Sequence, residues 1–235
     1  MQTVAVWLAE PALEVQPGDM EWFDADELRR ARAFMFERDR SLYVAAHRMR
    51  REILAKMLGA GPEALAFATS PGGKPYVACP ACDLSSSLSH TQGLVAFAAG
   101  PVLELGVDVE EIRPLEDLVS LSRATFSRRE AALAEAIPAS RQLEFFYSVW
   151  TLKEAYLKAR GLGLAVSLSR LGFDPELATH GMGRPRAFWT SPLLGDLASA
   201  WEFRQWRPTS RHVAAVAWRR QEGKALDIEV RWTRA

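Results

Sequence analysis

The chain contains little cysteine, little histidine and no net charge. Its 235 residues include two cysteines and four histidines, and its 29 basic residues balance 29 acidic ones. This balance gives no argument for a nucleic-acid partner, because proteins that bind nucleic acids usually carry a basic excess. The cysteines form one Cys79-x-x-Cys82 pair. Half of a zinc site and a redox pair are alternatives, but without a second pair a plain reduced loop is favoured.

The chain also lacks a long apolar run. Its longest candidate, residues 93–107, is interrupted by Gly100-Pro101 and by Glu104, so it falls short of the roughly 20 apolar residues that a membrane-spanning helix needs. The start of the chain carries no basic segment before an apolar core, which argues against a signal peptide. We therefore expect a cytoplasmic, monomeric protein with no membrane partner.

Periodicity and capping signals predict an α+β fold. Two capping boxes, Asp24 with Glu27 and Ser127 with Glu130, each mark the start of a helix, and Ser140 is expected to cap a longer one. The helices are expected after Asp24 and at 40–58, 128–136 and 141–160. Strands are expected at 3–8, 65–68, 85–90, 93–99, up to 110, and at 168–173, 185–190, 200–207, 212–218 and 226–232. The chain divides into halves of similar size, 1–103 and 104–235, with strands following helices in the second.

Arginines gather around the first two predicted helices. They are Arg29, Arg30, Arg32, Arg38, Arg40, Arg48 and Arg51. Two helices that bear arginines can hold a phosphate through forked hydrogen bonds. Solvated arginines that only keep a helix soluble are the commoner case, so both interpretations stay open.

Residues 150–164 combine a helical pattern with groups that can carry chemistry. At 3.6 residues per turn, Trp150, Glu154 and Lys158 lie in one row along the helix, which stops at Gly161 and Gly163. The ordinary interpretation is an exposed pair of Glu and Lys, which stabilises a helix by about 0.2–0.5 kcal/mol.

A second acidic element weakens that ordinary interpretation. Asp108 and Glu110 end a predicted strand and point to one side of it, whereas Val107 and Val109 point to the other. Two carboxylates on one strand face repel each other unless a cation lies between them. A hard divalent cation with oxygen ligands fits this arrangement, and Glu154 is a candidate third ligand.

Two basic residues lie upstream of the acidic strand. Lys74 lies between glycine and proline in a tight turn that fixes its backbone, and His90 ends a strand of the hairpin that leads to Asp108. A lone histidine is more often a satisfied structural residue. The position of His90 beside the predicted carboxylates nevertheless favours a functional role.

Three motifs occur along the chain in the same order as in a known family signature. They are Gly106-Val107-Asp108-Val109-Glu110, then Phe126-Ser127-Arg128-Arg129-Glu130, then Trp150-x-x-Lys153-Glu154-Ala155-x-x-Lys158-x-x-Gly161-x-Gly163-Leu164. Gly73-Lys74-Pro75 and Leu88-Ser89-His90 add support. Together they resemble the 4'-phosphopantetheinyl transferases of the surfactin-synthetase type over about residues 20–175, and the long third motif is the specific one.

The resemblance implies a fold, a reaction and a set of site residues. It implies two pseudo-related α+β halves with coenzyme A between them, and transfer of its phosphopantetheine arm to a serine of an acyl or peptidyl carrier protein, which releases 3',5'-ADP. Asp108, Glu110 and Glu154 would hold Mg2+, Lys158 would steady the phosphates and the leaving group, and Glu154 would also be the base. Lys74, Ser89 and His90 would bind the nucleotide end of coenzyme A and its 3'-phosphate, with Arg29 as a helper, and Lys158 would bind coenzyme A through its phosphates.

The chain departs from the family pattern at a few positions. Thr91 stands where the family often has serine, which preserves a hydroxyl group, and Val109 stands where some members have a polar residue. The arginine register also varies within the family. Other arginines of the first two helices are therefore alternatives to Arg29.

Two other function classes fit parts of the sequence. A module that binds coenzyme A or a carrier protein without chemistry would need neither metal nor base, and a Mg2+-dependent phosphohydrolase would need only the acidic residues. For a carrier of fatty-acid, polyketide or peptide biosynthesis, an acidic surface could meet Arg113, Arg123, Arg128 and Arg129 beside an apolar patch of Leu118, Leu121 and Phe126. Inward packing of these apolar residues is the alternative.

Overall fold

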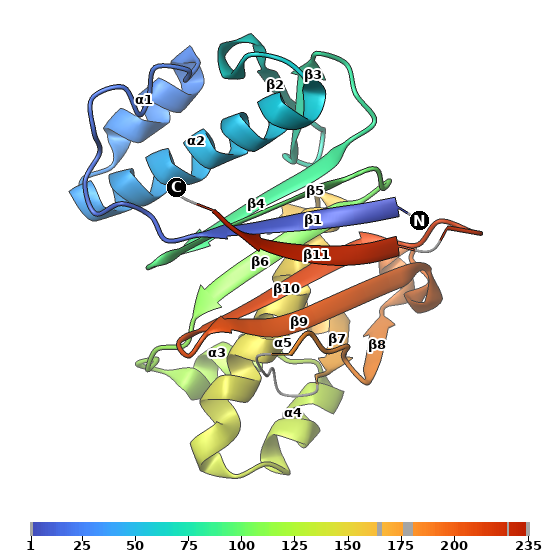
Figure 1. Ribbon diagram of the computed structural model, residues 1–235. Coiled ribbons are helices and arrows are strands. Elements are labelled where there is room, and N and C mark those ends of the chain that lie inside the picture. The colour runs from blue at the N-terminus through green and yellow to red at the C-terminus, as the bar shows by residue number, and fades with distance from the viewer. Residues whose placement is uncertain (1, 164–165, 176–180, 225, 234–235) are drawn as a thin grey trace.

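The computed structural model describes residues 2–163, 166–175, 181–224 and 226–233, and it has the mixed α+β architecture expected from the sequence (Figure 1). The helices are α1 (Ala25–Ala33), α2 (Glu37–Leu58), α3 (Leu118–Thr125), α4 (Arg128–Glu135) and α5 (Ala139–Arg160). The strands are β1 (Gln2–Ala9), β2 (Ala66–Thr69), β3 (Pro75–Cys79), β4 (Ser85–Thr91), β5 (Leu94–Gly100), β6 (Leu105–Glu111), β7 (Leu171–Asp174), β8 (Ala187–Thr190), β9 (Trp201–Thr209), β10 (His212–Arg219) and β11 (Leu226–Trp232). Short 3-10 turns include Pro62–Ala64, Leu168–Arg170, Pro192–Leu194 and Ala198–Ala200.

Two larger sheets form the centre of the fold. The first has the order β11-β1-β5-β4 and the second the order β6-β10-β9, while β2-β3 and β7-β8 are separate hairpins. All pairs in these two sheets are antiparallel except β1 with β11, which run parallel with Val4 opposite Ile228. The last strand of the chain therefore joins the sheet that contains the first.

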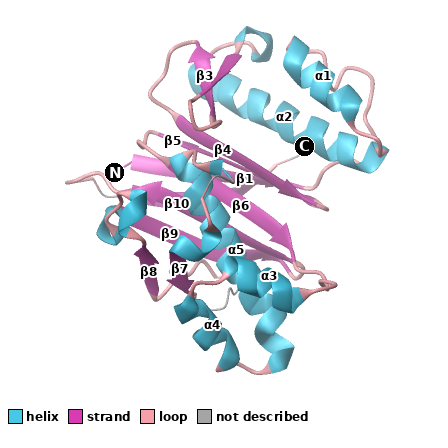
Figure 2. Ribbon diagram, turned by 180° about the vertical axis from the view of Figure 1, so that it is seen from behind, coloured by secondary structure: helices cyan, strands magenta, loops and turns pink. Residues whose placement is uncertain are grey.

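Each larger sheet has a long helix on one face and the other sheet on its second face (Figures 1 and 2). Alternation along β5 shows this, because Val95, Phe97 and Ala99 belong to the core beneath α2, whereas Leu94 and Ala96 belong to the core shared by both sheets. On β10, alternate residues contact the α5 core in the same way. The layers are therefore helix, sheet, sheet and helix.

The two sheets meet along β4 and β6 through side-chain hydroxyl groups. Ser87, Ser89 and Thr91 of β4 accept hydrogen bonds from the backbone N–H groups of Val107 (3.0 Å), Val109 (3.3 Å) and Glu111 (3.2 Å) of β6. We call these three residues of β4 the hydroxyl seam. The seam brings the strand that carries His90 next to the strand that carries Asp108 and Glu110.

A close approach of helix and strand fixes the height of α5 over β6. A Cβ atom on Gly106 would lie only 2.0 Å from the carbonyl oxygen of Ala155, so only glycine fits there. Helix α5 then ends at Gly161, whose φ of 63° is the left-handed conformation that favours glycine. These two glycines set where Glu154 and Lys158 lie relative to the acidic strand.

The structure confirms most of the predicted elements and corrects some. Both capping boxes are present, with Asp24 and Ser127 as N-caps. The predicted cap at Ser140 is wrong, because α5 begins at Ala139 after Pro138 without a side-chain cap. Helix α3 and strand β3 were not predicted, since both are short and lack a clear period. Residues 168–170 are a 3-10 turn instead of the start of a strand.

The division into halves, 1–103 and 104–235, stays a prediction. Its boundary falls between β5 and β6, where the chain passes from one sheet to the other. Strand β11 departs from it, because this strand belongs to the first sheet. None of the helices in the described ranges is long and apolar enough to cross a membrane.

Candidate functional site

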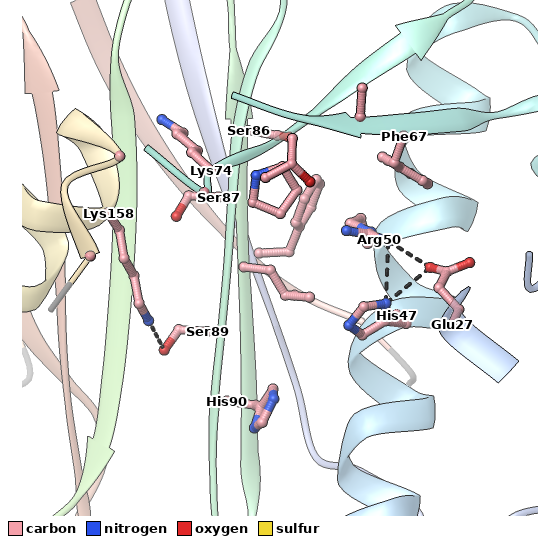
Figure 3. A pocket seen from close by; sticks show the side chains of 18 of the residues that line it. Glu27, His47, Arg50, Phe67, Lys74, Ser86, Ser87, Ser89, His90 and Lys158 are labelled. Atoms are coloured by element: carbon pink, nitrogen blue, oxygen red, sulfur yellow. Dashed lines mark hydrogen bonds and ion pairs between the residues drawn. The ribbon is translucent and has the colours of Figure 1, made fainter. Parts of the chain in front are cut away.

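A pocket of about 500 Å³ lies between the two halves of the chain. Residues of α1, α2, the β2–β3 turn and β4 line one part, and Glu154, Lys158, Gly161 and Gly163 line the rest. Figure 3 shows Lys158 and Ser89 on one side of the pocket and Glu27, His47 and Arg50 on the other. We call these sides the acidic end and the arginine end.

Asp108 is buried beside the acidic end: it does not itself line the pocket, but it contacts Lys158 and Ser89, which do. Its Oδ1 atom accepts hydrogen bonds from Lys158 Nζ at 2.6 Å and from Ser89 Oγ at 2.9 Å. Its Oδ2 atom is buried and has no hydrogen-bond partner among the described residues. Burial raises the pKa of this carboxyl group, although the ion pair with Lys158 works in the opposite direction.

The other two predicted carboxylates lie beside Asp108. Trp150 Nε1 donates to Glu110 at 3.1 Å, and Thr91 Oγ1 donates to its second oxygen at 3.4 Å. Burial and then the charge of Asp108 raise the pKa of Glu110 to about 7, and the same two causes raise the pKa of Glu154. The Glu154 Oε1 atom is buried and has no partner in the described part of the chain.

These carboxylates fit a hard divalent cation by their chemistry. Within the described ranges, no three His, Cys, Asp or Glu side chains already converge on one point as a preformed metal cage. Two buried carboxylate oxygens without partners, on Asp108 and Glu154, nevertheless leave acceptor capacity that a cation would use. Lys158 supplies the positive charge beside Asp108 in this structure.

The predicted coenzyme-binding residues are divided between the two ends. The hydroxyl of Ser89 lies at the acidic end, where it donates to Asp108 and accepts from Lys158 and Val109. His90 is exposed to the pocket, and desolvation, followed by the charge of Lys158, lowers its pKa. The structure therefore gives Ser89 acidic-end partners, whereas the resemblance implied a nucleotide contact.

The ammonium group of Lys74 bonds to both strand β6 and helix α5. Its Nζ atom donates to the carbonyl oxygens of Leu105 at 2.7 Å and Ala159 at 3.0 Å. Burial lowers the pKa of Lys74 to about 8. Lys74 lines the pocket, but its charged group holds the β2–β3 turn against β6 and α5.

The sequence left open a phosphate site on the two arginine-bearing helices, but it did not predict the cluster around Glu27 at the arginine end. Glu27 of α1 accepts hydrogen bonds from Arg50 at 2.6 Å, from Arg51 at 2.5 Å and from His47 at 2.9 Å, all on α2. Burial would raise the pKa of Glu27, but the bonds from His47 and Arg51 and the arginine charges outweigh it and lower the pKa to about 2. The spacing of His47, Arg50 and Arg51 along one helix was the available signal.

Two polar atoms of the arginine end have no partner within the described ranges. They are the hydroxyl of Tyr43 and the Nε atom of Arg50, both buried and both on residues that line the pocket. The Arg50 guanidinium lies over the Phe67 ring, 3.8 Å from its centroid. Buried polar groups in folded proteins are usually paired, so these atoms mark a place for a polar ligand.

The structure places the predicted helper arginine, Arg29, outside the pocket lining. The Arg29 side chain is 69% exposed and pairs with Asp26 at 3.0 Å, and it does not line the pocket. Its neighbour Arg30 does line it. One residue along a helix turns a side chain by about 100°, so the sequence motif did not fix which arginine faces inward.

The predicted carrier surface is partly present. Arg113, Arg123, Arg128 and Arg129 are exposed, as is Leu121, and α3 also exposes Val119. Phe126 is buried against Phe145 and Phe146, so it does not belong to a surface patch. Its ring packs inward because it directly precedes the N-cap of α4.

Comparison with known proteins identifies the family. A model described as the 4'-phosphopantetheinyl transferase superfamily matches residues 104–217. The chain is 33% identical to the 4'-phosphopantetheinyl transferase HetI of Nostoc sp., over 82% of this chain and 77% of that protein. It is 26% identical to the L-aminoadipate-semialdehyde dehydrogenase-phosphopantetheinyl transferase of Rattus norvegicus, over 92% of this chain and 73% of that protein. The chain belongs to the 4'-phosphopantetheinyl transferase superfamily.

Proposed function

We propose that this chain is a transferase of the surfactin-synthetase type, which moves the phosphopantetheine arm of coenzyme A to a serine of an acyl or peptidyl carrier protein. The observation that carries the proposal is the pocket itself. At one end it is lined by Glu154 and by Lys158, which contacts the buried Asp108, and at the other by donors that have no partner among the described residues. Coenzyme A needs both ends, because it carries a pyrophosphate in its middle and a phosphorylated nucleoside at its terminus.

The reaction exchanges one P–O bond for another. The serine oxygen forms a bond to the phosphorus that carries the pantetheine arm, the bond from that phosphorus to the bridging oxygen breaks, and 3',5'-ADP leaves with the electron pair. Glu154 accepts the serine proton, since it lines the pocket, its buried Oε1 atom has no partner among the described residues, and burial and the charge of Asp108 raise its pKa. Lys158 holds the phosphates and the leaving oxygen.

We propose Mg2+ as the cofactor, held by Asp108, Glu110 and Glu154. When bound, it would neutralise charge on the pyrophosphate and on the leaving group. Lys158, which already contacts Asp108, stays close to those phosphates. Ser89 fixes one side of the Asp108 carboxylate, and the other oxygen, which has no partner within the described ranges, can accept a ligand.

The nucleotide end of coenzyme A is assigned to the arginine end of the pocket. His90 and the backbone of the Lys74 turn lie on its path, and Arg30, Tyr43 and Arg50 line its far side. A 3'-phosphate there meets the donors that lack partners on Tyr43 and Arg50. Arg30 replaces Arg29 as the helper.

We also propose the natural setting of the reaction. The enzyme acts as a cytoplasmic monomer built of two pseudo-related halves, 1–103 and 104–235, without a nucleic-acid or membrane partner. Its carrier serves fatty-acid, polyketide or peptide biosynthesis. The acidic surface of the carrier docks on Arg113, Arg123, Arg128 and Arg129, next to Val119 and Leu121.

The deciding experiment measures the intact mass of an apo carrier protein after incubation with this chain, coenzyme A and Mg2+. A gain of about 340 Da, one phosphopantetheine arm, that disappears with a chelator is expected for metal-assisted transfer. Release of 3',5'-ADP without a carrier would indicate a phosphohydrolase instead. Coenzyme A binding without a mass gain on fatty-acid, polyketide and peptidyl carriers would indicate a binding module.

A further inference from the structure

The hydroxyl seam does more than join two sheets. Its three residues alternate along β4, so all three hydroxyl groups face β6, and each accepts one backbone N–H bond from that strand. The seam takes the place of a backbone ladder between β4 and β6, which are not paired strands. A hydroxyl group that accepts such a bond still has its own hydrogen to donate.

Two of the three hydroxyl groups donate that hydrogen to a carboxylate of the acidic end. Ser89 donates to Asp108 at 2.9 Å, and Thr91 donates to Glu110 at 3.4 Å. In each case the carboxylate directly precedes the residue whose N–H the same hydroxyl accepts. Ser87 follows the same pattern on Val107, but the preceding residue is Gly106, which has no side chain.

Glu110 is therefore held by both halves of the chain. Thr91, from the first half, donates to one carboxylate oxygen, and Trp150 on α5 donates to the other. Two donors on opposite oxygens fix the rotation of the carboxylate plane. Thr91 is branched at Cβ, which restricts its χ1 angle and so the direction of its hydroxyl group.

We propose that Thr91 is a positioning residue that orients Glu110 for the cation of the transferase site. This inference rests on the function proposed above. Because Thr91 belongs to the first half and Glu110 to the second, the two halves must be in contact for Glu110 to be oriented correctly. Outer groups that orient metal ligands commonly affect metal affinity about 10- to 100-fold.

The chain offers a matched control for the seam bond. Thr91→Val removes a hydroxyl group with little change in shape, which leaves the Glu111 N–H without an acceptor and leaves Glu110 held by Trp150 on one oxygen. Ser87→Ala leaves the Val107 N–H without an acceptor in the same way, but no carboxylate among the described residues accepts from Ser87. Because Ser87 lines the pocket, the affinity of both variants for coenzyme A is measured as well. Both variants should lower the urea midpoint of unfolding by similar amounts.

Metal affinity separates the two variants. With saturating coenzyme A and no carrier, we expect Mn2+ titrated by electron paramagnetic resonance to bind Thr91→Val about 10-fold or more weakly, and Ser87→Ala close to wild type. Thr91→Ser should recover most of the affinity, because it restores the donor. The transferase rate of Thr91→Val should fall at low Mg2+ and recover at high Mg2+, with the KM for coenzyme A little changed.

The outcomes also separate this inference from the proposed function. Equal Mn2+ affinity in Thr91→Val and Ser87→Ala, with an active wild type that binds the metal, would overturn the role of Thr91 and leave the transferase intact. A wild type that neither binds Mn2+ nor modifies a carrier would overturn the proposed function itself. If Thr91→Val does not fold, Thr91→Ala removes the same hydroxyl group with less bulk and takes its place.

Discussion

Two glutamates at opposite ends of the pocket, the buried Glu27 and the half-buried Glu154, have opposite electrostatic surroundings. Glu27 at the arginine end accepts hydrogen bonds from His47, Arg50 and Arg51, and its pKa is lowered to about 2. Glu154 at the acidic end has a buried oxygen with no partner among the described residues, and its pKa is raised by burial and by Asp108. The same side-chain type is thus saturated with cations in one place and short of them in the other.

The difference shows which charges hold the fold and which are kept for a ligand. Glu27 has its counterions within the chain, so it ties α1 to α2 and contributes to stability. Burial and the charge of Asp108 make Glu154 costly to ionise, and burial does the same to Asp108 despite its pairing with Lys158, which is typical of residues kept for function. A substitution at the arginine end should therefore change mainly the stability of the fold, and one at the acidic end mainly the activity.

The largest effect is expected from Glu154→Gln. We expect loss of the transfer rate by about 100-fold or more, because the serine loses its base and the cation loses a ligand. The free energy of unfolding should stay level or rise, since the variant removes a buried carboxyl group that burial disfavours when ionised. The transfer rate is measured from the mass of the carrier against time, and the free energy of unfolding from urea titration. Near-normal turnover would contradict the roles of Glu154 as the base and as a metal ligand.

A loss of stability is expected at the other end from Glu27→Gln. The change removes the carboxylate that pairs with the buried Arg50 and leaves Arg51 only its longer pair with Asp24, which should cost about 3–5 kcal/mol in the free energy of unfolding. Asp26→Asn is the matched control on the same helix. Asp26 forms only an exposed pair with Arg29, so that change should stay within about 0.5 kcal/mol of wild type. Equal stability of the two variants would contradict the contrast.

The arginine end also predicts an acid-sensitive fold. Burial lowers the pKa of His47 from 6.5 to about 4, so below pH 6.5 the unfolded chain binds a proton that the folded chain refuses. The free energy of unfolding should therefore fall as the pH falls from 6.5 toward 4. Glu27 adds a further loss below pH 4.5, toward pH 2, because its folded pKa is lowered.

His47→Gln tests the histidine part of this acid sensitivity. The amide can still donate to Glu27 but does not titrate, so urea midpoints between pH 7 and pH 5 should change less with pH than in wild type. An unchanged slope would assign the acid sensitivity to other groups.

The smallest effect on activity is expected from Tyr43→Phe. This substitution tests whether the arginine end also holds a group that serves a ligand and not the fold. The Tyr43 hydroxyl is buried without a partner in the described part of the chain, so its removal should not lower the free energy of unfolding. If the hydroxyl bonds coenzyme A, the KM for coenzyme A should rise about 3- to 10-fold, the equivalent of one hydrogen bond. A lower stability with an unchanged KM would place the hydroxyl in the fold instead.

The sequence predicted the strand and helix that carry the acidic residues because their signals are local. Alternation put Asp108 and Glu110 on one face of β6 with Val107 and Val109 on the other, and the two valines are indeed buried in the core between the sheets. The capping boxes at Asp24 and Ser127 were equally local and are confirmed. Short elements such as α3 and β3 offered too few residues for a period to appear.

The pairing of side chains between distant segments could not be predicted from the sequence, since it depends on residues far apart in the chain. The sequence by itself determined which residue types the acidic strand and α5 carry, because period and spacing act over a few residues. The tertiary structure decided that Lys158 pairs with Asp108 and not with Glu154, that Arg30 faces the pocket in place of Arg29, and that Glu27 is buried among arginines. Packing of β4 on β6 and of α1 on α2 brings these groups together, and only that packing selects each partner.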